Sequence, residues 1–419
     1  MLNLLLFLGL ISTPPAILAA TIYNPPLYSA DSPDDYHDGP IMQWDPETQL
    51  FYRYAMAYTQ CPLAGAPSTA TSMLYKFLNS AVQSLAGTGF DCAPILSPLL
   101  SLGFGRDCGF KSPLSGQTVR VHTSADLVNW TVKTNNALEG GPDWLLDSIL
   151  FRPAILRNPV TKKYVLWVNW LPRDEPVLAS YRRSGYAVGT SDSPDGPFVN
   201  WTRPAMSHAG GADFSLVFDA DAGDAYIAYG SWHNYAVSEG WRAEWYPDWA
   251  KDGHQIAIEK LDPSTFVEPA VDSGAVTVTS APQEAPAFFK RGGFFYLVHG
   301  DLCCFCARGG DAKVLASRSA QGPYALVGQL NAWGEDHVPA QNSDVFEVRA
   351  EGARETTYVW AADLWFSSKS GMKGDDHQYW EPLVWEDQEV EGLGTVPVPR
   401  RAGGGKWMGE WELGQHPKL

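Results

Sequence analysis

Five stretches of the chain repeat one order of residues: an apolar pair, a turn rich in Gly, Asp, Asn or Thr, and then an apolar strand with aromatic side chains. The strand aromatics that align are Phe51, Tyr164, Tyr226, Phe295 and Tyr358, and the last four follow one another at intervals of about 65 residues. Units of this length, each a small antiparallel sheet, are typical of propeller blades. The pattern predicts an all-β fold, a five-bladed β-propeller, with a β-sandwich as the alternative.

The first interval is longer than the others, which indicates an insertion in the first blade at about residues 60–113. Apolar residues between 73 and 85 recur at helical spacing, so the insertion is expected to be partly helical. A second repeat occurs at 123–130, 190–198 and 316–324 and is interpreted as the closing strand and turn of each unit. The stretch Glu391–Leu419 is expected to close or brace the propeller, which is predicted to span residues 21–419.

Residues 1–20 resemble a secretory signal peptide, because an apolar run at Leu4–Ile11 precedes two prolines and then small residues. The run is too short for a membrane anchor, which is the alternative. We therefore expect a secreted, extracellular protein. Export would allow disulfides, whose pairing the sequence does not fix, and glycosylation at the Asn129 and Asn200 sequons. The six cysteines are Cys61, Cys92, Cys108, Cys303, Cys304 and Cys306, and the first three lie in the insertion.

The formal net charge is −17, from 47 acidic and 30 basic residues. Such a chain repels phosphate backbones and anionic lipid, so nucleic-acid and membrane-surface partners are not expected. A monomer is expected.

Carboxylates recur at comparable offsets before the strand aromatics of different blades. Asp38 and Asp213 occupy this position in the first and third units, Glu284 in the fourth and Gln341 in the fifth, whereas the second has Phe151. The innermost strands of a propeller line one channel, so these side chains are expected to meet at one end. Two carboxylates, one protonated and one ionised, are what glycoside hydrolysis requires. The alternative for each is a purely structural role, as a turn or strand-end residue that makes a hydrogen bond.

The chain resembles glycoside hydrolase family 43 over most of residues 30–390. The motifs that carry the resemblance are HDGPI at 37–41, GADFSLVF at 211–218 and QEAPAFFKR at 283–291. The resemblance implies a five-bladed propeller with an inverting mechanism, in which Asp38 is the base, Asp213 modulates the acid and Glu284 is the general acid.

Other stretches are similar to the exo-β-1,3-galactanase branch of this family: RPAILRNP at 152–159, TSDSP at 190–194 and AQNS at 340–343. There the resemblance implies that Gln341 positions water. That branch has Glu where this chain has Phe151, and it usually lacks the Asp of the first blade. Cys303-Cys304 and residues 317–324 resemble the arabinanase branch, so the sugar stays open.

Several further residues are candidates for substrate binding. Arg152 is expected to hold a sugar hydroxyl or the carboxylates. Trp170, Trp232 and Trp365 follow the inner hairpins and are candidates to stack on sugar rings, with packing between blades as the alternative. No cofactor is expected. The resemblance implies that an axial metal bound near a His of the fifth blade is possible, but Gln341 occupies that region and no metal ligand is assigned to His37 or His337.

The sequence therefore predicts a secreted glycosidase that acts on cell-wall polysaccharide or oligosaccharide of galactan, arabinan or xylan type. A catalytically inactive propeller that binds glycan is the alternative, and Phe151 is the feature that favours it. A protein-interaction propeller would explain the aromatic residues but not the convergent carboxylates.

Overall fold

A computed structural model describes most of the chain. The described ranges are 21–23, 42–57, 118–172, 183–208, 211–231, 255–279, 283–301, 311–332, 337–338, 340–348, 356–364, 377–404 and 410–412. Within these ranges no helix is long and apolar enough to cross a membrane. The predicted signal peptide, the insertion at 60–113 with its helix, and the six cysteines lie outside the described residues.

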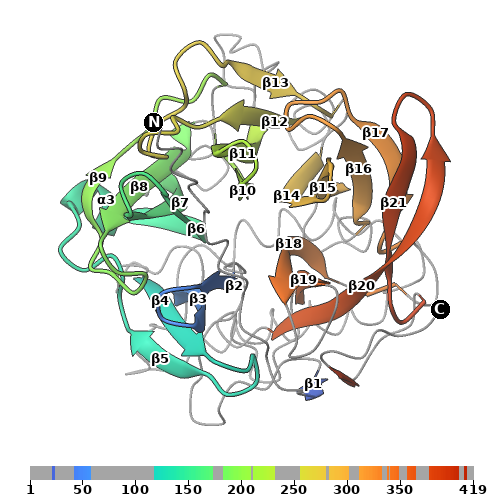
Figure 1. The fold of residues 1–419 in the computed structure, drawn as a ribbon. Helices are drawn as coiled ribbons and strands as arrows, with labels where there is room; N and C mark the ends of the chain where they lie inside the picture. The colour runs from blue at the N-terminus through green and yellow to red at the C-terminus, as the bar shows by residue number, and fades with distance from the viewer. Residues whose placement is uncertain are drawn as a thin grey trace, which may run out of the picture.

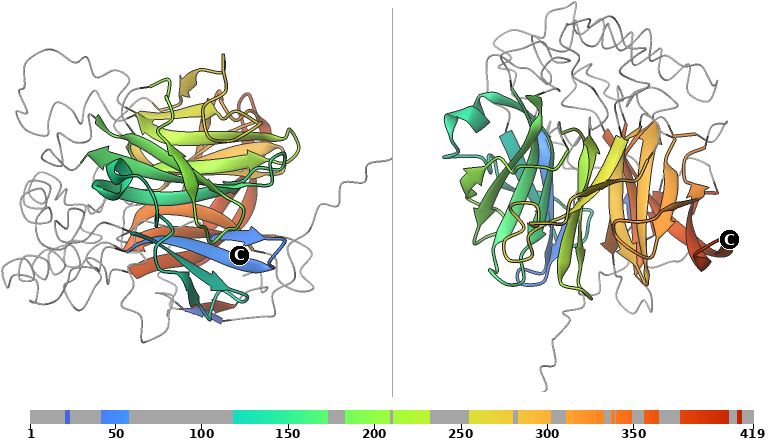
Figure 2. Two further views of the ribbon diagram at one scale, coloured as in Figure 1. Left: turned by 90° about the vertical axis from the view of Figure 1, so that its left-hand side faces the viewer. Right: turned by 90° about the horizontal axis from the view of Figure 1, so that it is seen from above.

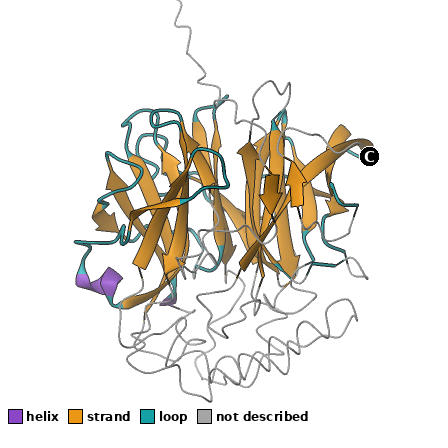
Figure 3. Ribbon diagram, turned by 90° about the horizontal axis from the view of Figure 1, so that it is seen from below, coloured by secondary structure: helices purple, strands orange, loops and turns teal. Residues whose placement is uncertain are grey.

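Five antiparallel sheets of four strands stand around a common axis (Figure 1). Within each sheet the strands pair in chain order. The fold is therefore the predicted five-bladed β-propeller. Side views show the blades standing next to one another (Figure 2). Strands and the loops that join them make up the described structure apart from the four-residue helix α3 (Asp143–Leu146) at its edge (Figure 3).

The strands of the five blades have the following bounds. Blade one comprises β2 (Met42–Asp45), β3 (Leu50–Ala57), β4 (Thr118–Ser124) and β5 (Thr131–Thr134). Blade two comprises β6 (Ser148–Arg157), β7 (Tyr164–Pro172), β8 (Gly185–Ser191) and β9 (Val199–Thr202). Blade three comprises β10 (Phe214–Asp219), β11 (Asp224–Ser231), β12 (Gln255–Lys260) and β13 (Ala275–Thr277). Blade four comprises β14 (Gln283–Arg291), β15 (Phe294–Asp301), β16 (Lys313–Ser317) and β17 (Ala325–Gln329). Blade five comprises β18 (Gln341–Val348), β19 (Thr357–Leu364), β20 (His377–Val390) and β21 (Gly394–Arg401).

The hydrophobic core lies between the blades, because both faces of the inner strands are covered. Each of the second strands carries one of the aligned aromatics. Phe51 packs between blades one and five, Tyr164 between blades one and two, and Tyr358 between blades four and five. The aligned aromatics predicted from the sequence thus contribute to the packing between neighbouring blades.

One expectation about the unit ends is wrong. The repeats at 123–130, 190–198 and 316–324 cover the end of the third strand and the turn after it, and a fourth strand follows in each blade. These fourth strands are short and partly exposed, as in β5 and β9. A short exposed strand has no buried face and therefore no hydrophobic pattern in the sequence. The sequence pattern for this reason ends at the third strand of each blade.

The chain closes the propeller through a small separate sheet. Strand β1 (Thr21–Tyr23) pairs with β22 (Glu410–Glu412), with Ile22 opposite Trp411. The side chain of Ile22 is buried against residues of blades one and five. The expectation that the C-terminal stretch braces the propeller is confirmed, and β21 of the same stretch completes blade five.

Candidate active site

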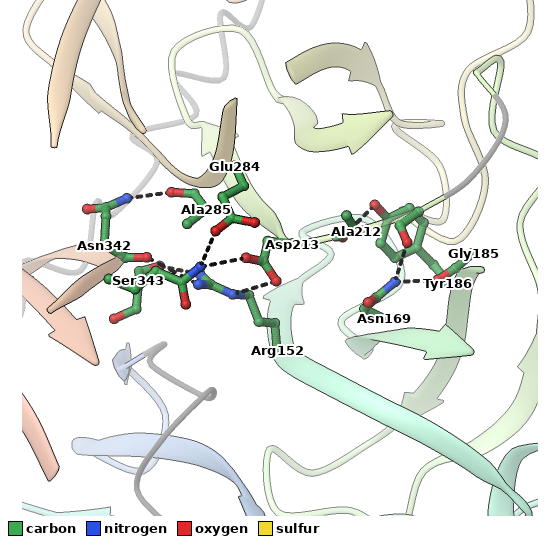
Figure 4. Close-up of polar contacts among 12 residues, drawn as sticks. Arg152, Asn169, Gly185, Tyr186, Ala212, Asp213, Glu284, Ala285, Asn342 and Ser343 are labelled. Carbon is green, nitrogen blue, oxygen red and sulfur yellow. Dashed lines mark hydrogen bonds and ion pairs between the residues drawn. The ribbon is translucent and has the colours of Figure 1, made fainter. Parts of the chain in front are cut away.

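Three blades bring a carboxylate, a second carboxylate and an amide to one place. Figure 4 shows the two carboxylates, Asp213 and Glu284. Asp213 immediately precedes β10, Glu284 is the second residue of β14, and Gln341 is the first residue of β18. The Gln341 Nε2 atom donates to Asp213 Oδ2 at 3.2 Å and to Glu284 Oε1 at 3.3 Å. The residues that were counted back from the strand aromatics therefore meet across three blades.

Arg152 of blade two is the fourth residue of this cluster. Its side chain is buried, with Nε 3.0 Å from Asp213 Oδ1. The other guanidinium nitrogens reach blade five, where Nη2 donates to the Asn342 carbonyl at 3.1 Å and Nη1 to the Ser343 carbonyl at 3.4 Å. Of the two roles predicted for Arg152, the contact with a carboxylate is confirmed. A contact with sugar stays a prediction.

Arg152 and Glu284 each lie at a β-bulge, which sets the direction of the side chain. The β6–β7 pairing slips between Phe151 and Ala154, and the β14–β15 pairing slips between Glu284 and Ala287. Inside the bulges, Arg152 and Ala285 have φ angles of 44° and 56°. Positive φ is uncommon in residues other than glycine and is characteristic of sites where the backbone is held in an unusual shape for function. A bulge also tolerates proline, which follows each of these residues and has no N–H for the ladder.

The segment before β10 is held by polar side chains of blade two (Figure 4). Asn169 donates to the carbonyls of Gly185 and Gly211 at 2.8 and 3.1 Å, and Tyr186 donates to the Ala212 carbonyl at 2.9 Å. These bonds fix the backbone next to Asp213. Sequence reasoning did not identify Asn169 or Tyr186, because an amide within an apolar strand does not show which carbonyls another element brings to it.

A further carboxyl lies buried beside the cluster. Asp344 is 6% exposed, and burial raises its pKa to about 7, against the opposing effects of the Val345 N–H and the Arg152 guanidinium. Near neutral pH both the neutral and the ionised form of this carboxyl are therefore populated. It was not among the predicted residues, and its only signal in the sequence is an acidic residue inside an otherwise buried strand.

Of the four remaining candidates, only Trp170 belongs to the part of the chain that the structure describes. Asp38, Trp232 and Trp365 lie outside the described residues. Trp170 is 8% exposed, its indole N–H donates to the Trp144 carbonyl at 3.1 Å, and the Arg203 guanidinium lies 4.9 Å from its ring centroid. These contacts account for Trp170 as packing, and its role in sugar binding stays a prediction.

The described residues offer no set of metal ligands. Among them no three His, Cys, Asp or Glu side chains lie together as a metal site would require. The His337 ring instead contacts the amide of Asn331, with 3.3 Å between Nε2 and Nδ2.

The fold and the cluster define a class: a five-bladed propeller in which carboxylates from different blades meet, as in propeller glycosidases. The sequence model of glycosyl hydrolases family 43 matches residues 110–332, just over half of the chain. The chain therefore belongs to glycosyl hydrolase family 43, a family of glycosidases. No curated protein matches the chain.

Solved structures of this family share the fold. One is a β-1,3-galactosidase of family 43, with 18% identity and a TM-score of 0.57 over 94% of this chain and 64% of that one. An exo-β-1,3-galactanase from Clostridium thermocellum has 21% identity and a TM-score of 0.51 over 68% of this chain and 55% of its own. The enzyme of the same name from Phanerochaete chrysosporium, with β-1,3-galactotriose, has 16% identity and a TM-score of 0.55 over 90% and 67%. The chain thus spans less than two thirds of the length of the first two.

Proposed function

We propose that the protein is a hydrolase of β-1,3-linked galactan that removes sugar from the chain end, with Glu284 as its general acid. The observation that carries the proposal is the Gln341 amide between Asp213 and Glu284, which brings two carboxylates from different blades within reach of one substrate bond. The sugar and the mode of attack are taken from the activities named for the similar structures.

In this mechanism each residue has one task. Glu284 is partly buried and protonates the departing glycosidic oxygen. Because Gln341 donates to Oε1 of Glu284, the transferred proton sits on Oε2. Asp213, neutralised by Arg152, positions the acid. Asp38 activates the attacking water from the opposite side of the sugar, and inversion follows.

The proposal is tested by sugar release from β-1,3-galactan, arabinan and xylan, with wild type and Glu284→Gln. The substitution keeps the shape of the side chain and removes its proton. We expect release from galactan and at least about a hundredfold loss in the variant. The matched control is Glu47→Gln, an exposed acidic residue paired with Arg157, which should keep full activity. Release from arabinan or xylan alone would correct the sugar, and equal losses in both variants would refute the role of Glu284.

A propeller that binds glycan without cleaving it is the second candidate. The observation that favours it is Phe151, which is apolar and 5% exposed where the galactanase branch has Glu. Its signature would be retention of the wild type on immobilised β-1,3-galactan with no release of sugar. Glu284→Gln should then weaken retention, since the carboxylates would serve as sugar ligands.

Export is part of the proposal. Its support is the leader-like pattern of residues 1–20 and the two sequons at Asn129 and Asn200. A mature N-terminus close to Thr21, determined on protein recovered from the culture medium, would agree with it. An intact N-terminus on protein retained in cells would contradict it.

A further inference from the structure

One buried residue in blade five, Asn342, has a side-chain amide that contacts the segment carrying Glu284. The Asn342 side chain is 0% exposed. Its Nδ2 donates to the Ala285 carbonyl at 2.7 Å and to the Val298 carbonyl at 3.2 Å, both in blade four. Its Oδ1 accepts a hydrogen bond from the indole N–H of Trp360 at 2.7 Å. Figure 4 shows the bond to Ala285 next to the carboxylates.

The orientation of this amide is determined by its partners. An indole N–H only donates and a carbonyl only accepts. Turning the amide by half a rotation would therefore oppose Nδ2 to the Trp360 N–H and Oδ1 to the two carbonyls, and all three hydrogen bonds would be lost. Asn342 thus has a single satisfied arrangement.

The bond to Ala285 supports the backbone from which Glu284 extends. Ala285 follows Glu284 directly and lies in the bulge, where the ladder passes from Glu284 opposite Gly300 to Ala287 opposite Val298. Ala285 therefore has no register partner in β15, and its backbone is in the left-handed region. A buried carbonyl without a donor is costly, so the donor from blade five stabilises the bulge in this shape.

The main chain of the same residue supports the other carboxylate. The Asn342 carbonyl accepts from Arg152 Nη2, and the Nε of that guanidinium contacts Asp213. Gln341, which donates to both carboxylates, is the preceding residue.

We propose that Asn342 is a positioning residue for the general acid: its side chain holds the Glu284 bulge, and its carbonyl holds Arg152 against Asp213. This inference rests on the proposed function, because it assigns Asn342 a role in the proton transfer by Glu284. A group displaced by about 1 Å can lose on the order of a hundredfold in rate, so the alignment that Asn342 provides is expected to be visible in kinetics.

The test uses two probes that differ in their need for a proton, β-1,3-galactotriose and β-D-galactosyl fluoride. The alcohol leaving group of the trisaccharide needs protonation, whereas fluoride departs with little help. Asn342→Asp keeps the size of the side chain, but in its ionised form it has no donor for Ala285 and Val298. We expect a loss of about ten- to a hundredfold in kcat on galactotriose and less than about threefold on the fluoride.

The double variant Asn342→Asp/Glu284→Gln separates positioning from a general structural effect. If Asn342 acts through the acid, the double variant should be no slower on galactotriose than Glu284→Gln alone, within about twofold. A merely structural role predicts equal losses on both probes and losses that multiply in the double variant. That result would overturn the inference.

A gentler variant covers the case in which Asn342→Asp does not fold. Trp360→Phe removes the N–H that orients the amide together with part of the ring, and we expect a loss of about three- to tenfold on galactotriose with little change on the fluoride. Trp167→Phe is the matched control, since Trp167 is also 0% exposed and its N–H donates to the Phe266 carbonyl at 3.0 Å, outside the cluster. Equal behaviour of the two tryptophan variants would contradict the proposal. A wild type that hydrolyses neither probe would overturn the proposed function, and this inference with it.

Discussion

In blade two, β6 breaks its pairing between Phe151 and Ala154, and in blade four, β14 breaks its pairing between Glu284 and Ala287. The sequences at these points, FRPA and EAPA, have proline at the same place, preceded by a residue with positive φ. The two strands therefore share one backbone device. They differ in the side chain at the bulge: Phe151 packs into the core between blades one and two, whereas Glu284 contacts Gln341, which also donates to Asp213.

The difference shows that the backbone provides the bulge in both blades, whereas the side chains at the bulge determine which chemical group it carries. In both blades the bulge interrupts the ladder and redirects the chain at the end of the inner strand. In blade four the residue before the left-handed position is the carboxylate, and in blade two the left-handed residue itself, Arg152, reaches the cluster. One repeated backbone feature thus provides the proposed acid from one blade and its supporting cation from another.

Among the variants that test this comparison, removal of the Arg152 side chain should cause the largest loss of unfolding free energy. Arg152→Met leaves Asp213 without its cation and the carbonyls of blade five without their donor. Breaking such a pair costs about 3–5 kcal/mol when it is buried, and somewhat less here because Asp213 is partly exposed. We expect a clear fall in unfolding free energy by urea titration and at least about tenfold lower activity.

Arg157→Met is the control for this variant, at the other end of the same strand. Arg157 pairs with the exposed Glu47, so its loss should cost less than about 1 kcal/mol. Similar costs for the two arginine variants would contradict the bridging role of Arg152.

The second variant introduces into blade two the carboxylate that blade four has at the equivalent position. Phe151→Glu places a carboxylate among the apolar side chains that surround Phe151. We expect a loss of about 3 kcal/mol in unfolding free energy at pH 7, with partial recovery at pH 5 where the carboxyl is neutral. Phe151→Leu should cost less and show no such pH dependence. A Glu variant as stable as the Leu variant would show that this position faces solvent or the channel.

The buried carboxyl beside Arg152 predicts a dependence of stability on pH. In the folded chain the Asp344 pKa is about 7, above the ordinary 3.8, so the native state keeps a proton that the unfolded chain has lost. Its contribution to stability is therefore greatest at low pH and falls as pH rises through about 7. Asp344→Asn, compared with wild type by thermal unfolding, should gain about 2 kcal/mol in relative stability between pH 5 and pH 8. A difference that does not change with pH would contradict the raised pKa.

A buried histidine in blade one provides the smallest effect and the opposite sign. Burial, together with Arg53 and Arg120, lowers the His122 pKa to about 3. The native state therefore excludes a proton that the unfolded chain binds below about 6.5, and stability is lost as pH falls. His122→Gln should remove about 1–2 kcal/mol of the difference between pH 7 and pH 5. Unchanged acid sensitivity in the variant, followed by the same unfolding assay, would refute this assignment.

The sequence was sufficient for the five blades and for the meeting of Asp213, Glu284 and Gln341. The reason is the symmetry of the fold: comparable offsets along equivalent strands become neighbouring positions around one axis. Asp38 belongs to the same prediction and lies outside the described residues.

The supporting residues were not predicted for a different physical reason. Asn342 and Asp344 flank a slip in the β18–β19 pairing. A slip in pairing depends on two strands together, and the partners of a buried amide come from another blade. No pattern within one strand contains that information.

The account is tested most directly by Glu284→Gln and Phe151→Leu, measured side by side on β-1,3-galactotriose. These residues are equivalent in backbone and differ only in what they present. The account predicts at least about a hundredfold loss for Glu284→Gln and a folded Phe151→Leu that stays within about fivefold of wild type. Comparable losses in the two variants, or the larger loss at Phe151, would contradict it.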